Sequence, residues 1–533
     1  MIEVIFSALF AGLWGGGDGH TKTLLKKLLK FLTLRVTLVG LSILAQAGIL
    51  IFALVQFDIN FVEFYAFSLV LSLGIVLWLI NRNTNPAYKI AWIVPILLFP
   101  IFGGMFYLLL GGNHMGFHSK KKMQGIQRKI ANNLHTNDGL IHRVKTRDPQ
   151  AAGLMRYIQT YAYCPPCENT ATKYYALGEL AFADMKAELR RAKHYIFLEY
   201  FIIEHGTMWD EILAILREKV AEGVDVRVIY DDLGCVMTLP YRYDLELEAM
   251  GIRCCVFNPF LPVLNSHFNH RDHRKILVVD GHTAFTGGIN LADEYINAYP
   301  KYGHWKDTAI LLRGEAAWNL TVLFLSTWDH LRGEDESLSS FLPKESPPVY
   351  GKGVVQPFAD NPLDEEAVSQ TVYLHLINTA TRYVYINTPY LVIDNETVVA
   401  LTSAAKRGVD VRIITPHIPD KWFVHAVTRA NYEVLVQAGV RIYEYTPGFN
   451  HAKTFAVDDT LGVVGTINMD FRSLYLHFEC GALLYDTDTV RDVRDDFLQT
   501  LRRCQIISLA DCRSVRLYQK LGRALLRMFA PLM

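Results

Sequence analysis

A pattern of five residues occurs twice in this chain at identical spacing. Each copy has a histidine, a lysine two residues later, an aspartate, and then a glycine followed three positions later by an asparagine. A lone His-x-Lys is common, whereas five matched positions repeated within one sequence indicate an internal duplication. The copies are His273, Lys275, Asp280, Gly287 and Asn290, and His451, Lys453, Asp458, Gly465 and Asn468.

Each copy covers a predicted pair of strands. Residues 276–279 and 454–457 are β-branched or apolar runs that end at an aspartate-containing turn. Because alternate residues of a strand face the same side, the histidine and lysine of each copy share one face. The returning strands, 283–286 and 461–464, end in the glycine-rich stretch, which brings the asparagine back beside that pair.

Histidine, lysine and asparagine on one surface suit a phosphodiester substrate. The lysine offsets the charge of the phosphate, and the amide donates hydrogen bonds to its oxygens. A neutral imidazole is a good nucleophile toward phosphorus, and a second, protonated imidazole can supply the proton that the leaving alkoxide needs. Two copies of the pattern therefore predict a phosphohistidine intermediate, which passes its phosphoryl group to water or to an alcohol.

Each histidine also needs a carboxylate that fixes its tautomer. Asp307 and Glu479 lie downstream of the two copies, and we expect each on a further strand. A metal site is the alternative, since His267, His270 and His273 are spaced by three. That spacing sends strand neighbours to opposite faces, and no matching cysteine or carboxylate cluster accompanies it, so we expect no metal.

The rest of the chain repeats in the same way. The sequence Gly-Val-Asp-Val-Arg at 223–227 returns at 408–412, and the Gly-x-Arg at 251–253 returns at 439–441. Strand and helix patterns alternate around these repeats, which predicts two duplicated α/β halves with pseudo-twofold symmetry and a site where they meet. The expected domains are 1–115, a membrane region; 116–335, the first half; and 336–533, a linker and the second half.

The N-terminal region is strongly apolar. Residues 36–57 and 64–80 form two uncharged runs separated by a short polar link, which predicts a transmembrane helical hairpin. A third run, 91–110, is flanked by lysines on both sides and contains Pro95 and Pro100, which are expected to break a helix. The positive-inside rule places both flanks in the cytoplasm, so we favour a re-entrant or interfacial segment over a third span.

Composition narrows the classes of function. The chain has 53 basic and 53 acidic residues, and this neutral balance argues against a nucleic acid partner. Its eight cysteines do not form a disulfide-framework pattern, and Cys164-Pro-Pro-Cys167 is interpreted as a loop rather than a redox site. Residues 517–532 form a basic amphipathic stretch, which suits either a solvated last helix or one lying on an anionic lipid surface.

The duplicated pattern resembles the HKD motif of the phospholipase D superfamily. Residues 269–275, 287–295, 443–451 and 465–473 are similar to the bacterial cardiolipin synthase branch, and the similarity covers essentially the whole chain. Thr466 replaces the second glycine of the first copy, Gly288, and the Cys164–Cys167 pair is unusual for the family.

The resemblance implies a role for each site residue. It makes His273 the nucleophile and His451 the general acid, although equivalent motifs cannot by themselves separate the two. It implies no metal and no other cofactor. The implied catalytic set is His273, Lys275, Asp280, His451, Lys453 and Asp458, with Asp280 and Asp458 expected to support turns, and Asn290, Asn468, Asp307 and Glu479 hold the phosphate or orient the histidines.

The function expected from the resemblance is phosphatidyl transfer that makes cardiolipin from phosphatidylglycerol. The phosphatidyl donor stays open between phosphatidylglycerol and phosphatidylethanolamine. A membrane phospholipase D that uses water has the same site residues and is the alternative, while two intact motifs argue against an inert scaffold. We expect a multi-pass protein of the cell membrane with its catalytic domain on the cytoplasmic side, and no oligomer is needed to complete the site.

Overall fold

The structure is a computed structural model. It describes residues 61–100, 103–104, 107–111, 117–260, 269–344, 349, 351–362, 364 and 366–532, together with Leu44, Gly48, Ile51 and Phe52. The chain divides into two compact units, Met1–Phe64 with Phe260–Asn265, and Tyr65–Pro259 with Ser266–Met533. Both copies of the duplicated motif belong to the second unit, and all that follows concerns that unit.

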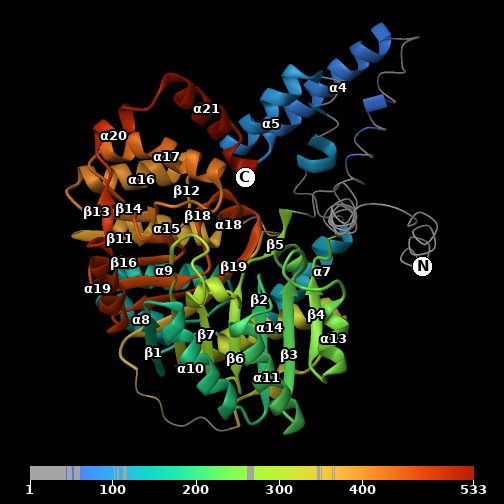
Figure 1. Cartoon of the computed structure of the whole chain (residues 1–533), viewed down its shortest axis with the longest axis vertical. Helices are drawn as coiled ribbons and strands as arrows, with labels where there is room; N and C mark the ends of the chain where they lie inside the picture. Colours follow the sequence, from blue (N-terminus) through green and yellow to red (C-terminus); the bar gives the residue numbers. More distant parts are fainter. Residues whose placement is uncertain are drawn as a thin grey trace, which may run out of the picture. The chain divides into compact units, whose positions relative to one another are not determined.

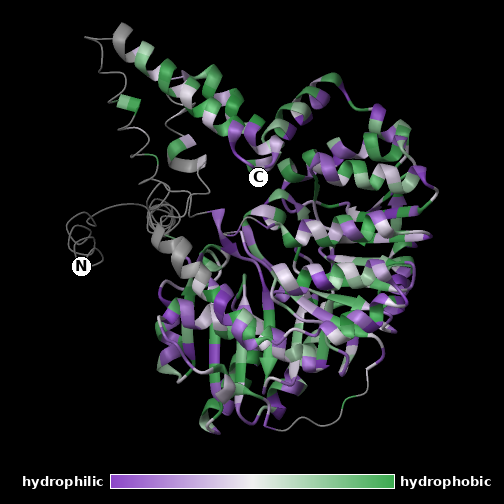
Figure 2. Ribbon diagram, turned by 180° about the vertical axis from the view of Figure 1, so that it is seen from behind, coloured by the Kyte–Doolittle hydropathy of each residue, from purple (hydrophilic) through white to green (hydrophobic). Residues whose placement is uncertain are grey.

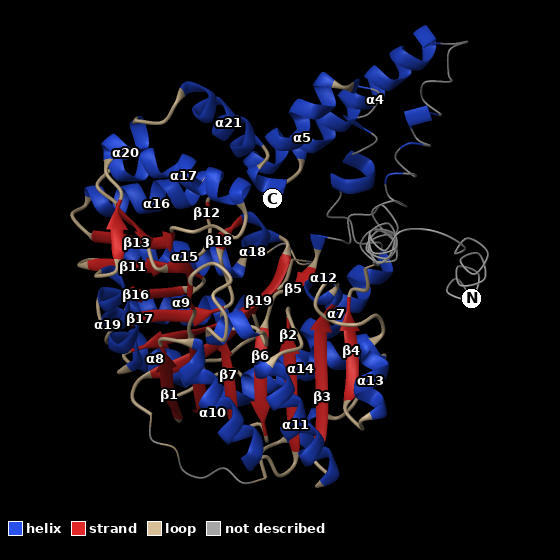
Figure 3. Ribbon diagram, viewed as in Figure 1, coloured by secondary structure: helices blue, strands red, loops and turns tan. Residues whose placement is uncertain are grey.

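A seven-stranded mixed sheet organises the first half (Figures 1 and 3). Its three strands on one side run parallel to one another, and the others are antiparallel to their neighbours. In spatial order the strands are β1 (Thr170–Tyr175), β9 (Ala309–Gly314), β7 (Thr283–Gly287), β6 (Lys275–Val279), β2 (Tyr195–Tyr200), β3 (Asp225–Asp231) and β4 (Arg253–Phe257).

The sheet of the second half repeats this order and these strand directions. One antiparallel edge strand is added, and β5 (Arg271–Asp272) of the first half joins it from the side. The predicted duplication of α/β halves is therefore confirmed. The strands are β10 (Val354–Asp360), β19 (His477–Tyr485), β17 (Leu461–Gly465), β16 (Thr454–Val457), β11 (Tyr383–Asn387), β13 (Asp410–Pro416), β14 (Arg441–Tyr445) and β20 (Cys504–Ile506).

Helices connect the strands of both sheets. Their starts are set locally, as at Asp394, whose carboxylate accepts the Thr397 N–H and so caps α16. The first half has α10 (Gly178–Arg191), α11 (Thr207–Ala221), α12 (Asp232–Cys235), α13 (Tyr243–Ala249) and α14 (Glu315–Arg332), preceded by α7 (Phe117–Asn133), α8 (Asp138–Lys145) and α9 (Pro149–Tyr161); the second has α15 (Val368–Thr379), α16 (Asn395–Lys406), α17 (Trp422–Gln437), α18 (Phe471–Tyr475), α19 (Thr489–Leu501), α20 (Leu509–Arg513) and α21 (Leu517–Met528).

The two halves share a hydrophobic core. One continuous cluster of buried side chains includes Phe197 and Phe324 from the first half and Phe358 and Phe455 from the second. Phe197 and Phe324 stack at 4.7 Å between ring centroids. Burial of a common core holds the halves in one relative position, which a site built from both halves requires.

The N-terminal part of the unit contains two apolar helices, α4 (Phe61–Asn81) and α5 (Pro86–Leu98), coloured mostly as hydrophobic in Figure 2. The predicted span 64–80 lies within α4, whereas 36–57 lies outside the described residues apart from four of them. Among the residues that the structure describes, no helix is both long and apolar enough to cross a bilayer.

The segment 91–110 differs from the expectation in one respect. Pro95 does not break the helix but lies inside α5, which ends at Leu98, before Pro100. A π-helical turn, η2 (Tyr107–Gly111), follows further along. The Cys164–Cys167 segment lies in a loop, and both of its thiols are free and buried.

Candidate active site

Two short strand pairs cross from one half to the other. β5 pairs in parallel with the start of β19, with Asp272 opposite Phe478. β15 (Gly448–Asn450) pairs in the same manner with β8 (His304–Lys306). In each pair, the residue that follows the paired segment is a motif histidine on one strand and a carboxylate on the other, namely His273 with Glu479 and His451 with Asp307. The pairing therefore brings each histidine and its carboxylate together in register.

Each motif histidine contacts a carboxylate of the opposite half. His273 Nδ1 lies 2.8 and 3.0 Å from the two carboxylate oxygens of Glu479, and His451 Nδ1 lies 2.6 Å from Asp307 Oδ2. Both carboxylates are fully buried. Glu479 lies on β19 as expected, but the expectation for Asp307 was wrong, because it lies in the short link between β8 and β9.

The two motif lysines have equivalent positions. Lys275 Nζ donates to the carbonyl of His273, and Lys453 Nζ donates to that of His451. Each ammonium is thereby bent back beside its own histidine, and both lysine side chains are almost fully buried. Two cations and two imidazoles in one closed space make a site for an anion.

Burial controls the protonation of this cluster. It lowers the pKa of His273 well below the usual value, an effect that the charges of Lys275 and other cations increase. Burial also lowers the pKa of His451 to about 4 and those of Lys275 and Lys453 to about 8 and about 7. Burial raises the pKa of Glu479. Both imidazoles are therefore neutral at neutral pH until an anionic ligand raises their pKa.

The two motif asparagines differ in their partners. Asn290 donates to Tyr295 Oη at 2.7 Å and accepts the Ile202 N–H at 3.0 Å. Asn468 is also buried, but its Oδ1 has no hydrogen-bond partner among the described residues. An amide oxygen is an acceptor, so Asn468 would bind a phosphate oxygen through its Nδ2–H groups and not through this open atom.

The motif aspartates lie away from the histidines. Asp280 accepts the N–H groups of residues 193–195, and Asp458 accepts those of residues 381–383. Asp280 follows the last residue of β6, whereas Lys275 is the first, so at about 3.3 Å per residue they stand about 16 Å apart. In this structure both aspartates fix turns, in the left-handed conformation, instead of facing the anion site.

The one departure between the motif copies has a steric cause. A Cβ at Gly288 would lie 2.0 Å from Asp307 Oδ1, so the first copy has no room for a side chain. At the equivalent place in the second copy, the Thr466 hydroxyl donates to Glu479 Oε2. Each carboxylate thus needs a different residue at this position.

The surroundings of the two histidines were not predicted. His451 is enclosed by the rings of Tyr295, Trp305 and Phe449, at centroid distances of 5.6, 5.4 and 5.7 Å. His273 instead has the ring of Phe201 beside it, at 5.1 Å, and a polar neighbour, His477, at 5.7 Å. The period of two along β19, which puts His477 on the face of Glu479, was a signal that could have identified it.

His273, His477 and Glu479 form a group that could in principle hold a metal ion, with ligand atoms within 4.8 Å of one another. The Glu479 oxygens are already hydrogen-bonded, one to His273 and the other to Thr466. Lys275 and Lys453 also act on His273 as nearby positive charges. A cation would meet repulsion at this place, so the arrangement favours an anion.

Two copies of a His-Lys site joined across a pair of α/β halves define a phospholipase D-like enzyme. The family model described as "Cardiolipin synthase, PLD-like domain" matches residues 185–299 and 373–501, and that described as "Phospholipase_D-nuclease N-terminal" matches 70–112. A cardiolipin synthase of Geobacillus kaustophilus is 35% identical over 88% of this chain and 94% of its own length. The chain belongs to the cardiolipin synthase family of the phospholipase D superfamily.

Two further proteins extend the comparison. An uncharacterized protein of Streptococcus mutans is 41% identical over 86% of this chain and 100% of its own. The crystal structure of phosphatidylserine synthase from Haemophilus influenzae matches with a TM-score of 0.54 and 15% identity, over 71% of this chain and 97% of that one. That likeness concerns the fold alone.

Proposed function

We propose that the protein transfers a phosphatidyl group to phosphatidylglycerol and so makes cardiolipin, with His273 as nucleophile and His451 as general acid and base. The observation that carries this proposal is the pair of His–carboxylate contacts, each bridging the two halves around two buried lysines. The names of the relatives support the substrate class, since several of them are cardiolipin synthases.

The first step forms the phosphohistidine. Glu479 holds a proton on Nδ1 of His273, which leaves the Nε2 lone pair free to attack phosphorus. As the P–N bond forms, the P–O bond to the head-group alcohol breaks, and His451 gives its proton to the departing oxygen. Lys275, Lys453 and Asn468 bind the non-bridging oxygens, whose negative charge raises the pKa of His451 enough for it to carry that proton.

The second step reverses the first with a new alcohol. A hydroxyl of the accepting phosphatidylglycerol takes the place of the departed alcohol, and His451 removes its proton. The new P–O bond forms as the P–N bond breaks, which returns the electron pair to His273. One diester replaces another of similar energy, so no nucleotide or other cofactor is required. Both histidines come from one chain, so the site needs no second copy.

We further propose that this chemistry takes place at the cytoplasmic face of the cell membrane, with the spans 36–57 and 64–80 as a multi-pass anchor. Helix α21 supports the location. Its residues Leu517, Leu521 and Leu525 recur every four positions and are all exposed. The helix also carries basic residues but no acidic ones, a combination that suits an anionic lipid surface better than water.

A lipid-product assay tests the function. Purified protein in mixed micelles with labelled phosphatidylglycerol should yield cardiolipin and glycerol in equal amounts, and His273→Ala should yield neither. Phosphatidic acid without cardiolipin would instead establish the hydrolase. Phosphatidylethanolamine as the labelled donor, with unlabelled phosphatidylglycerol as acceptor, decides between the two donors.

A further inference from the structure

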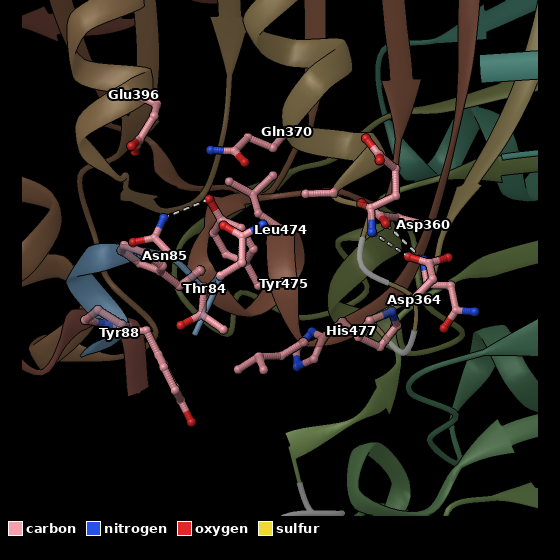
Figure 4. A pocket seen from close by; sticks show the side chains of 18 of the residues that line it. Thr84, Asn85, Tyr88, Asp360, Asp364, Gln370, Glu396, Leu474, Tyr475 and His477 are labelled. Carbon is pink, nitrogen blue, oxygen red and sulfur yellow. Dashed lines mark hydrogen bonds between the residues drawn. The ribbon is translucent and has the colours of Figure 1, made fainter. Parts of the chain in front are cut away.

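A cavity of about 610 Å³ opens beside His273 and is not part of the site described above. Its size falls within the range of roughly 300–1,000 Å³ that is usual for small-molecule sites. Three segments form its walls: the link between α4 and α5, the segment from the end of β10 into α15, and the turn from α18 into β19. Figure 4 shows this cavity with His477 between Thr84 and Asp364.

The cavity borders the catalytic centre at two points. His477 lines it, and the same imidazole lies 4.0 Å from the Glu479 carboxylate and 5.7 Å, ring to ring, from His273. Asp360, also in the lining, is the strand partner of Glu479 in the β10–β19 pair. A ligand that fills the cavity therefore ends within one side chain of the proposed nucleophile.

At its other end the cavity meets the apolar helices. Residues 82–86 connect α4 to α5, and the exposed side chains near this link include Leu77, Trp78, Ile80 and Ile90. The connection is tied to the catalytic unit, since Asn85 Nδ2 donates to Tyr475 Oη at 3.0 Å. One end of the cavity is thus catalytic, and the other lies beside surface suited to hydrocarbon.

The lining between these ends is amphipathic. Phe471, Leu474 and Pro531 supply an apolar side, and the polar side carries the carboxyl groups of Asp360, Asp364, Glu366 and Glu396 and the guanidinium of Arg82. Burial raises the pKa of Asp360 to about 6 and that of Asp364 to about 7, so at neutral pH Asp364 is about half protonated while Asp360 remains mostly ionised.

The lining of the cavity contains two buried polar atoms that are not hydrogen-bonded to any described residue. Thr84 Oγ1 and His477 Nδ1 have no hydrogen-bond partner in the described part of the chain. Leaving a buried polar atom unpaired is unfavourable, so a ligand with hydrogen-bonding groups is expected at both.

We propose that this cavity is the entry site for the donor phospholipid, holding its glycerol backbone and ester groups while the phosphate reaches His273 past His477. The acyl chains then leave along α4 and α5. The assignment rests on the proposed function. It also agrees with an in-line displacement at phosphorus. The attacking His273 and the departing alcohol then lie on opposite sides of the phosphorus atom, and the glycerol backbone of the lipid, which stays bonded to phosphorus, projects to the side.

Ala367→Trp tests the proposal, because Ala367 lines the cavity and is not part of the catalytic machinery. The large side chain should raise KM for phosphatidylglycerol about tenfold or more, equivalent to about 1.4 kcal/mol of binding, with kcat little changed. Ala187→Trp, at a half-buried alanine of α10, is the matched control and should leave KM as in the wild type. An unchanged KM in a folded Ala367→Trp protein overturns the proposal.

Thr84→Val is a second test that does not depend on whether the Ala367→Trp protein folds. It keeps the size of the side chain and removes only a hydroxyl that bonds to no described residue. We expect a severalfold rise in KM with an unchanged Tm, while equal KM values would contradict lipid contact at Thr84.

Binding separates failure of this inference from failure of the function. The inactive His273→Ala protein in nanodiscs, with phosphatidylglycerol that carries a diazirine near its ester groups, should be labelled within 82–88, 360–370 or 471–477. Adding Ala367→Trp should abolish that labelling. If the wild type makes no cardiolipin but this labelling pattern holds, the function fails and the lipid site stands; label confined to other segments overturns the site.

Discussion

The two half-sites have the same backbone plan but different surroundings. Each places a histidine opposite a carboxylate from the other half, with a lysine bent back onto the histidine carbonyl. His451 is packed among three aromatic rings, whereas His273 contacts one, Phe201, and adjoins His477, which lines the cavity. The duplication thus supplies two equivalent histidines, and their different neighbours fit the unequal tasks that we propose for them.

Replacing each histidine in turn is the most direct test of this comparison. His273→Ala and His451→Ala should each lower cardiolipin synthesis by at least about 10³-fold. With a phosphatidyl ester of p-nitrophenol, whose leaving group needs no proton, His451→Ala should still release one equivalent of p-nitrophenol and accumulate phosphohistidine. His273→Ala should give no burst. Rapid-quench and mass measurements check this.

His142→Ala, at an exposed position of α8, serves as the control and should behave as the wild type. A burst in His273→Ala but not in His451→Ala would exchange the two roles. The lipid cavity would then lie beside the general acid instead of the nucleophile.

Removing the carboxylate charge should have the next largest effect. Glu479→Gln and Asp307→Asn each lose the group that fixes a histidine tautomer, and we expect a loss of about 10³-fold in kcat, below the roughly 10⁴-fold of a triad aspartate. The loss in Asp307→Asn should shrink with the p-nitrophenyl ester, because that substrate does not need His451 as an acid. The loss in Glu479→Gln should persist. Equal responses to the two substrates would contradict the division of tasks.

The position of Gly288 and Thr466 sharpens the comparison further. Gly288→Ala forces a Cβ against Asp307 and should reduce activity more than Thr466→Val, which loses one hydrogen bond to a charged group. Such a bond is worth about 1.5–3 kcal/mol, so we expect about 10- to 100-fold lower kcat for Thr466→Val. Gly153→Ala in α9, where no described atom lies within 4 Å of the added Cβ, is the control. A fully active Gly288→Ala enzyme would show that Asp307 can move.

The sequence was sufficient for whatever depended on short-range pattern. Repeated segments predicted two equivalent sheets, and the pattern placed Lys275 beside His273, although His273 lies in the link between β5 and β6 and not on a strand. Sequence patterns could not predict that His273 pairs with Glu479, because β5 and β19 meet only in the tertiary structure.

Other features failed for equally physical reasons. Asp307 follows a strand too short to recognise by alternation, and the need for Gly288 is a contact between segments that are distant before folding. Pro95 lies within α5, although the pattern had suggested a break in the helix there. Asn290 and Asn468 are equivalent in the sequence, but only the fold brings the Tyr295 hydroxyl to the amide of Asn290.

The pH dependence should reveal the smallest difference, that between the two lysines. Burial lowers the pKa of Lys453 to about 7 and of Lys275 to about 8, so both ammonium groups lose their protons as the pH rises through 7–8. Phosphate binding weakens with them, and kcat/KM, which reports the free enzyme, should fall on the alkaline side. An arginine at position 453 keeps its charge at all these pH values. In Lys453→Arg, the pH at which kcat/KM falls should therefore rise toward the value set by Lys275. Lys173→Arg, at an exposed lysine of β1, should leave the profile unchanged. If the limb stays in place in Lys453→Arg, then Lys453 is already charged throughout this range, and the two half-sites hold the phosphate equally.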